Sequence, residues 1–289
     1  MKPSDFRYVV PATVEEAVTL LDQDAVGTKL LAGGQSLVPM MNFRLATPSI
    51  VVDLNHIPGL RFVSEEAGVL SIGAMTRHFE VAGNDLVAKR LPLLAHAAAL
   101  IGYPAIRNRG TIGGSLAHAD PAAEMPLVAL TLDAEFVAVG PTGERTIQAR
   151  DFFDGFFTTA LAPAEVLTEI RFDIRGSLEA WAFEELARKT GDFAIAAAAV
   201  AASLDGGVVR RLRVGIGGAS DRPVRANRLE TLLIGKPVSA ARDTLKDGSA
   251  RVAIAADNPG NAAGDRWEVA TILAERALAT VLAHPGGNP

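Results

Sequence analysis

The first 176 residues show both helical and extended hydrophobic spacing, and this mixture predicts an α+β fold. Thr13 followed three residues later by Glu16 forms a capping box that begins a helix. Asp120-Pro121 is a second helix start, with an N-cap acid before a proline. The predicted helices cover 14–21, 92–101 and 120–130. Strands are predicted at 29–31, 50–54, 69–73 and 166–174, and 134–139 and 145–149 bracket Pro141-Thr142-Gly143 as a hairpin.

The pattern changes after Arg175-Gly176-Ser177, which predicts a domain boundary near residue 176. Beyond this point, extended runs at 194–204 and 208–216 flank Asp205-Gly206-Gly207 and predict a hairpin. Helical spacing follows at 227–234 and 265–282. We therefore expect one domain over 1–176 and a C-terminal α+β domain over 177–289.

Composition narrows the classes of protein to which this chain can belong. A formal net charge of −5 over 289 residues disfavours nucleic-acid binding, which depends on clustered Lys and Arg. The chain has no cysteine, so it supplies no thiolate to an iron–sulfur cluster, and this fits a cytoplasmic protein. The longest near-apolar run, 193–204, is shorter than the ~20 residues of a membrane-spanning helix, so no membrane span is expected.

Two glycine-rich loops carry the strongest chemical signal. The first is Ala32-Gly33-Gly34-Gln35-Ser36-Leu37, directly after a predicted strand, and the second is Gly110-Thr111-Ile112-Gly113-Gly114-Ser115. Paired glycines let the backbone approach a ligand closely, and exposed N–H groups in such turns bind anionic oxygens. Ser36, Thr111 and Ser115 add hydroxyl donors. Two such loops on facing segments would suit the diphosphate of a dinucleotide.

Other interpretations of these residues remain open. Each loop is also compatible with a tight turn that binds nothing. Neither loop is the fingerprint of an ordinary NAD domain or a P-loop, and the five histidines lack metal-ligand spacing. His118 beside Asp120 is compatible with a structural or a catalytic pair. Asp120 and Glu124, one helical turn apart, are compatible with an acid/base pair, with acceptors for sugar hydroxyls, or with charges that favour a helix N-terminus.

Around these loops the sequence resembles the molybdenum hydroxylase flavoproteins. The residues from Ala32 to Leu54 resemble the first FAD motif of that family, and those from Arg107 to Glu124 resemble the second. The family includes the medium subunits of aerobic carbon monoxide dehydrogenases and of N-heterocycle hydroxylases, and the middle domain of xanthine dehydrogenases. The likeness covers the whole chain, including Arg188-Lys189-Thr190-Gly191-Asp192-Phe193-Ala194.

The resemblance implies an FAD-binding domain of the vanillyl-alcohol oxidase (PCMH) type, in two α/β subdomains of about 1–58 and 59–176. It implies FAD as the cofactor and no catalytic or metal-binding residue in this chain. Leu167 and Phe193 would pack on the flavin ring, Asp120 and Glu124 would lie near the ribityl and ribose groups, and core or surface packing is the alternative for Leu167, Phe193, Glu184 and Ile101. The implied FAD-binding residues are Ala32, Gly33, Gly34, Gln35, Ser36, Leu37, Ile101, Thr111, Ile112, Gly113, Gly114, Ser115, Asp120, Glu124, Leu167, Glu184 and Phe193.

Two positions depart from the family pattern. Gln35 stands where carbon monoxide dehydrogenases typically have histidine, which makes carbon monoxide a less favoured substrate of the complex. Phe193 stands where a tyrosine is often found, which keeps the shielding of the ring but removes one hydroxyl.

The resemblance also implies partner chains. A large subunit would carry a molybdenum–pterin, and a small subunit would carry two 2Fe–2S clusters, in a dimer of heterotrimers. Electrons would pass through FAD to an external acceptor. Two other hypotheses remain. One is a stand-alone FAD oxidoreductase of the vanillyl-alcohol oxidase type, with His118 or Asp120 as acid or base, and the other is an assembly subunit that has lost its cofactor.

Overall fold

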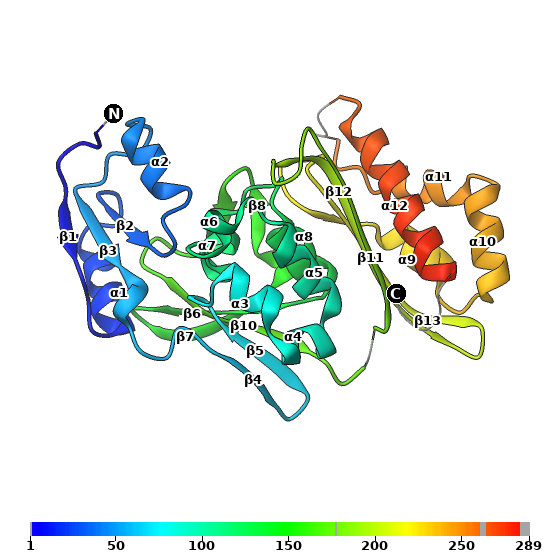
Figure 1. Ribbon diagram of the computed structural model, residues 1–289, viewed down its shortest axis with the longest axis horizontal. Helices are drawn as coiled ribbons and strands as arrows, with labels where there is room; N and C mark the ends of the chain where they lie inside the picture. Colours follow the sequence, from blue (N-terminus) through cyan, green and yellow to red (C-terminus); the bar gives the residue numbers. More distant parts are fainter. Residues whose placement is uncertain (1, 177, 261–263, 284–289) are drawn as a thin grey trace.

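Three larger β-sheets follow one another along the molecule in a computed structural model that describes residues 2–176, 178–260 and 264–283 (Figure 1). The first is a parallel sheet of three strands in the order β1-β3-β2. Its first helix is capped by Thr13, whose Oγ1 accepts from the Glu16 amide at 3.2 Å, as the capping box predicted. This part contains β1 (Arg7–Val9), α1 (Val14–Gln23), β2 (Thr28–Leu31), α2 (Leu37–Asn42), β3 (Ile50–Asp53) and the 3-10 helix η1 (Leu54–His56).

The second sheet is antiparallel, with five strands in the order β4-β5-β10-β6-β7. Helices from α3 to α8 lie over it and share its core (Figure 1). The strands are β4 (Val63–Glu66), β5 (Val69–Gly73), β6 (Glu135–Gly140), β7 (Gly143–Gln148) and β10 (Val166–Asp173), with a small pair β8 (Phe153–Gly155) and β9 (Thr158–Thr159). The helices are α3 (His78–Gly83), α4 (Asp85–Arg90), α5 (Pro92–Leu100), α6 (Pro104–Arg107), α7 (Ile112–His118), α8 (Glu124–Thr131) and the 3-10 helix η2 (Ala149–Asp151).

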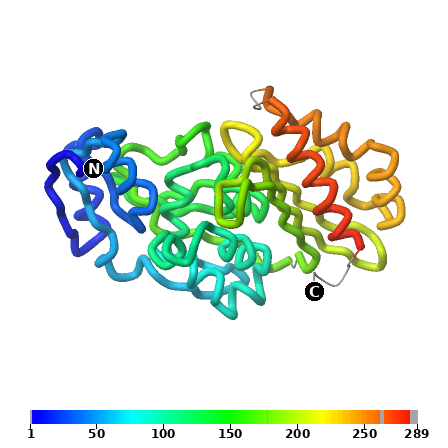
Figure 2. The backbone as a smooth tube through the Cα atoms, turned by 45° about the horizontal axis from the view of Figure 1, so that its top comes forward, coloured from blue at the N-terminus to red at the C-terminus, as the bar shows by residue number. Residues whose placement is uncertain are grey.

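The third sheet is antiparallel, in the order β11-β12-β13-β14, and it lies between two layers of helices. Helix α12 covers one face, and α5 and α8 contact the other. In Figure 2 the orange and red C-terminal helices lie at the opposite end of the molecule from the blue N-terminal part. The elements are β11 (Ala180–Ala187), β12 (Ala194–Asp205), β13 (Val208–Gly217), β14 (Val224–Arg225), α9 (Asn227–Leu233), α10 (Val238–Lys246), α11 (Ser249–Ala255) and α12 (Arg266–Ala283).

Strand β12 is rich in alanine because both of its faces are buried. Ala197 and Ala199 belong to the core of the central part, whereas Ala198 and Val200 pack toward α12. The neighbouring strand β13 is closer still to α8, because a Cβ on Gly215 would lie 2.9 Å from the Leu127 side chain. Small side chains therefore allow the C-terminal sheet to dock directly on the helical layer of the central sheet.

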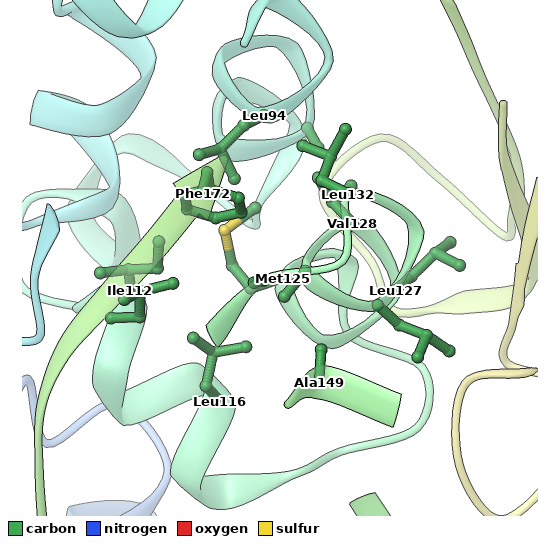
Figure 3. Close-up of a cluster of buried hydrophobic side chains, with 14 of the residues drawn as sticks. Leu94, Ile112, Leu116, Met125, Leu127, Val128, Leu132, Ala149 and Phe172 are labelled. Atoms are coloured by element: carbon green, nitrogen blue, oxygen red, sulfur yellow. The ribbon is translucent and has the colours of Figure 1, made fainter. Parts of the chain in front are cut away.

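The start of the second glycine loop is anchored in the central core. Figure 3 shows Ile112 and Leu116 of α7 beside Met125 of α8 and Phe172 of β10. All four side chains are almost completely buried. Burial of a side chain of this size contributes roughly 1.5–3 kcal/mol, so these contacts fix the orientation of α7 on the sheet.

A cluster of charged side chains joins the C-terminal sheet to the end of α8. Arg225 forms ion pairs with Glu230, at 2.8 Å, and with Asp133, and its Nη1 donates to the Leu130 carbonyl at 3.1 Å. Arg213 pairs with Asp133 at 3.0 Å and donates to the carbonyl of Leu132. Cations are favourable at the C-terminus of a helix, and here two arginines from another part of the chain donate to carbonyls at the end of α8.

The predicted helix start at Asp120-Pro121 is wrong by one turn. The Asp120 carboxylate accepts from the Ala122 amide at 2.9 Å and closes a turn, and the Pro121 carbonyl accepts from Gly218 of the C-terminal part. Helix α8 therefore begins at Glu124, with Ala123 as its N-cap. Asp120 and Glu124 consequently do not share one helical face, because only Glu124 belongs to the helix.

Several elements were not predicted. They include the short helices α2, α3, α4 and α6, the helices α10 and α11, and the strands β1, β4 and β11. No helix within the described residues is both long and apolar enough to cross a membrane. The same part of the chain contains no group of three or more His, Cys, Asp or Glu side chains that could hold a metal ion. The division at residue 176 remains a prediction.

Replacing Arg225 tests the charged cluster. Its side chain is only 13% exposed, so Arg225→Met would leave the buried Glu230 carboxylate without its ion pair. We expect the free energy of unfolding, measured by urea denaturation, to fall by about 3 kcal/mol. Arg90→Met, which removes an exposed ion pair with Glu65, is the control and should leave stability unchanged. Equal stabilities of the two variants would contradict the proposed importance of the cluster.

Candidate functional site

The first glycine loop presents unengaged main-chain amides. It leaves β2 through Ala32 and turns at Gly34, whose φ of 74° is readily accessible only to glycine. The Gly34 carbonyl accepts from Val38, and the Gly33 carbonyl accepts from the side chain of Gln35 at 3.0 Å. Within the described residues, the amides of Gly34, Gln35 and Ser36 donate to no other group. Three consecutive amides of this kind can bind an anionic oxygen.

The second glycine loop uses most of its amides to hold itself in place. Thr111 is the N-cap of α7, and its Oγ1 accepts from the Gly114 amide at 3.0 Å. The Gly113 amide donates to the carbonyl of Ala74 at 2.9 Å, and the Ser115 amide donates to that of Thr111. The sequence suggested main-chain amides in both loops, but most amides of the second loop are engaged, and it offers the hydroxyl groups of Thr111 and Ser115 in their place.

The two loops are in direct contact. A Cβ added to Gly33 would lie 2.6 Å from the Cα of Gly110, closer than real Cβ atoms approach. A Cβ added to Gly114 would lie 3.3 Å from the Cβ of Ala32. The tertiary structure thus brings together two segments that are far apart in the sequence, as a diphosphate-binding site requires. Glycine at position 33 is needed for this close approach and not for an unusual backbone angle.

Three carboxylates form a cluster where α8 begins. Glu124 is only 8% exposed, and this burial raises its pKa to about 7, with further repulsion from Glu185 and Asp120. Burial also raises the pKa of Glu185, and its Oε2 has no hydrogen-bond partner among the described residues. A carboxyl group with a pKa near neutrality is partly protonated and can donate to a hydroxyl or a phosphate as well as accept.

Glu184 lies on the opposite face of β11 from this cluster. Successive side chains of a strand point to opposite faces, and Glu184 pairs with Arg276 of α12 at 3.1 Å. Trp181 and Phe183, which share a face with Glu185, pack toward the central core. The resemblance drew attention to Glu184, but the strand directs Glu185 to the carboxylate cluster. The alternation from Trp181 to Glu185 is the sequence signal that could have identified it.

The remaining proposed positions lie in different surroundings. Leu167 is 5% exposed and belongs to the central core, on a strand that contacts α7. Phe193 is 64% exposed, directly before β12. Its turn touches the turn of Ile101, because a Cβ on Gly191 would lie 2.9 Å from the Gly102 carbonyl oxygen. The structure therefore brings Ile101 and Phe193 into neighbouring turns and keeps Leu167 inside the core.

His118 has the surroundings of a packed side chain. Its ring lies 5.0 Å from that of Phe157, and burial lowers its pKa. None of the hydrogen bonds among the described residues connects His118 to Asp120, so the geometry provides no support for a catalytic pair.

The two loops fit the diphosphate of an extended dinucleotide. The first loop supplies amides, Ser36 and Ser115 supply hydroxyl groups, and the missing side chain of Gly114 allows α7 to lie close to Ala32. Asp120 and Glu124 follow α7 in the sequence, and their carboxyl groups could accept hydrogen bonds from the sugar hydroxyls. The amides and hydroxyl groups of the two loops would bind the diphosphate as neutral donors.

Comparison with known proteins accounts for both halves of the chain. Residues 4–172 match the family model of the FAD binding domain in molybdopterin dehydrogenase. Residues 181–281 match that of the CO dehydrogenase flavoprotein C-terminal domain.

Relatives match over most of their length. The carbon monoxide dehydrogenase medium chain of Hydrogenophaga pseudoflava is 43% identical over 236 residues, which cover 82% of each chain. The glyceraldehyde dehydrogenase medium chain of Sulfolobus acidocaldarius is 35% identical over 284 residues, covering 97% of this chain and 100% of the relative. The structure of quinoline 2-oxidoreductase from Pseudomonas putida 86 matches with a TM-score of 0.89 at 35% identity, covering 99% of both chains.

The fold and these matches define a flavoprotein with an FAD-binding domain of the PCMH type and a C-terminal domain. The chain belongs to the FAD-binding medium subunits of the molybdenum hydroxylases, a family of oxidoreductases.

A side chain at position 33 should separate the two loops. We expect Gly33→Ala to weaken FAD binding at least about tenfold, because the added Cβ meets the backbone of Arg109 and Gly110. Flavin fluorescence titration of the flavin-free chain measures this. Gly83→Ala is the matched control, because a Cβ there meets nothing within 4 Å. Wild-type affinity in Gly33→Ala would show that the loop contact is not required.

Glu124 should make the stability of the flavin-free chain depend on pH. Its pKa is raised from 4.5 to about 7 in the folded protein, so the folded state binds more protons than the unfolded state between these values. Its contribution to stability is therefore full at low pH and is lost as the pH rises through about 7. Between about pH 5 and about pH 8, wild type should lose about 2 kcal/mol relative to Glu124→Gln in urea denaturation. Parallel pH profiles of the two proteins would contradict this prediction.

Proposed function

We propose that this chain is the electron-transfer subunit of a heteromeric molybdenum hydroxylase. FAD held by the two glycine loops would receive electrons from 2Fe–2S clusters and pass them to an external acceptor. The observation that carries this proposal is the contact between Gly33 and Gly110, beside three unengaged amides of the first loop. It forms a cradle for a diphosphate in a chain that belongs to the FAD-binding medium subunits.

The work of this chain's own residues is binding and orientation. The amides of Gly34 to Ser36 would hold the diphosphate, with hydroxyl groups from Ser36, Thr111 and Ser115. Asp120 and Glu124 would bind the sugar and ribityl hydroxyls, and the raised pKa of Glu124 allows it to donate a proton within such a hydrogen bond. Bound FAD would supply the redox chemistry.

Packing on the flavin ring is proposed for a second set of residues. The exposed Phe193 would cover one side of the ring. Its turn contacts the turn of Ile101, and this contact would hold Phe193 in place. Leu167 would contribute from the core, close to α7. Glu184 remains proposed only near the rim of the site, because its carboxylate is paired with Arg276.

Partner chains would hold the other redox centres. A small subunit would carry two 2Fe–2S clusters and a large subunit the molybdenum–pterin, in a cytoplasmic dimer of heterotrimers. The absence of cysteine supports this division, because the chain has no thiolate for an iron–sulfur cluster. The names of relatives, including the medium chains of carbon monoxide and glyceraldehyde dehydrogenases, support the same arrangement. The domain division at 176, with subdomains of about 1–58 and 59–176, belongs to this proposal.

Purification of the native complex through a tag on this chain tests the proposal. We expect co-purifying large and small chains, together with FAD, molybdenum and iron. A complex carrying Gly33→Ala should contain less FAD and should reduce its acceptor in proportion to the FAD that remains, whereas its iron–sulfur absorbance still bleaches with substrate. The substrates tried would be those named for the relatives. A chain that purifies alone and oxidises a substrate unaided would contradict the proposal.

A further inference from the structure

Two polar side chains outside both glycine loops join them to each other. The Asn55 Nδ2 donates to the carbonyl of Ala32, in the first loop, at 2.9 Å. Arg77 donates through Nη2 to the Asn55 Oδ1 and through Nη1 to the carbonyl of Arg109, directly before the second loop. The two nitrogens of one guanidinium thus connect the two loops through a single intermediate side chain.

Asn55 and Arg77 are each bound by a neighbouring carboxylate. The main-chain amide of Asn55 donates to the Asp53 carboxylate at 2.9 Å, its Nδ2 donates to the same carboxylate, and that carboxylate also accepts from Tyr8 of β1. The main-chain amide of Arg77 donates to Glu80 at 2.9 Å, at the start of α3. The connection therefore runs from the N-terminal parallel sheet to the helical layer of the central sheet, and both of its ends are fixed.

Arg77 also contributes a positive charge close to the loops. It is half-buried, and none of the ion pairs among the described residues includes it. Burial and the neighbouring cations Arg61 and Arg109 lower its pKa, but a guanidinium remains charged. A cation at this place favours an anionic ligand on the adjacent loops.

We propose that Arg77 is a positioning residue for FAD. Its guanidinium, acting with Asn55, holds the two loops at the spacing that a diphosphate requires. This inference rests on the proposed binding of FAD at these loops. Lysine cannot replace arginine here, because one ammonium on a flexible stem does not reach two fixed acceptors in the same way as the planar fork.

Titration of the flavin-free full chain with FAD and with ADP tests the inference. ADP carries a diphosphate without a flavin, so damage to the diphosphate site should weaken both ligands by the same factor. We expect Arg77→Met and Asn55→Ala each to weaken both about tenfold, and Arg77→Lys to remain close to Arg77→Met. Arg61→Met is the matched control, because it removes a neighbouring cation and an ion pair with Glu80 without touching a loop.

The outcomes separate the inference from the function on which it rests. If wild type binds neither FAD nor ADP, the proposed function fails. A second outcome is that wild type binds both ligands, and that Arg77→Met and Asn55→Ala bind them as tightly as Arg61→Met does. The positioning role of Arg77 would then be overturned, and the proposed function would stand. Full recovery of affinity in Arg77→Lys would also overturn it, because charge would then suffice. The thermal midpoint of each flavin-free variant must match that of Arg61→Met, and Asn55→Ala decides the result if Arg77→Met does not fold.

Discussion

The close approach of two backbone segments at Gly33 and Gly110 is the constraint on which the candidate site depends. One segment leaves a parallel sheet, and the other enters a helix packed on an antiparallel sheet. Four glycines meet four different requirements here. Gly33 permits the contact, Gly34 permits the turn, Gly113 permits α7 to lie on Ala74, and Gly114 leaves room for the Thr111 hydroxyl that caps α7. A side chain at any of them would change a different part of the site.

The C-terminal part of the chain contains Glu185 and Phe193 of the candidate site, and it also supports the site from a distance. It holds α8 at both ends, through Gly218 at the Pro121 carbonyl and through Arg225 and Arg213 at the last turn. The alanines of β12 and the glycines of β13 allow the C-terminal sheet to lie close to α8. Glu124, at the start of α8, is therefore fixed by contacts that lie at the far end of its helix and in another sheet.

Burial, and not position in the helix, controls the ionisation of Glu124. A carboxylate in the first turn of a helix is normally stabilised by the helix dipole, by about 0.3–1 kcal/mol. The loss of hydration at this buried place outweighs that effect, and two neighbouring carboxylates add to it. The amides of the first loop and the protonated form of Glu124 both present neutral donors. Such a site can bind a charged diphosphate, while the Arg77 guanidinium donates to a backbone carbonyl directly before the second loop.

The sequence by itself determined many of the helices and strands, the two loops and the family, because each depends on residues that are near one another in the chain. The capping box at Thr13, the hairpin at Asp205 and the glycine pairs are local signals of this kind. Only the tertiary structure decided that Asn55 and Arg77 meet between the loops, and that Glu185, not Glu184, faces Glu124. It also moved the start of α8 from Asp120 to Glu124, because a distant amide from Gly218 engages the intervening turn. These features depend on which distant segments come into contact, and hydrophobic periodicity along one segment carries no information about its partner in another.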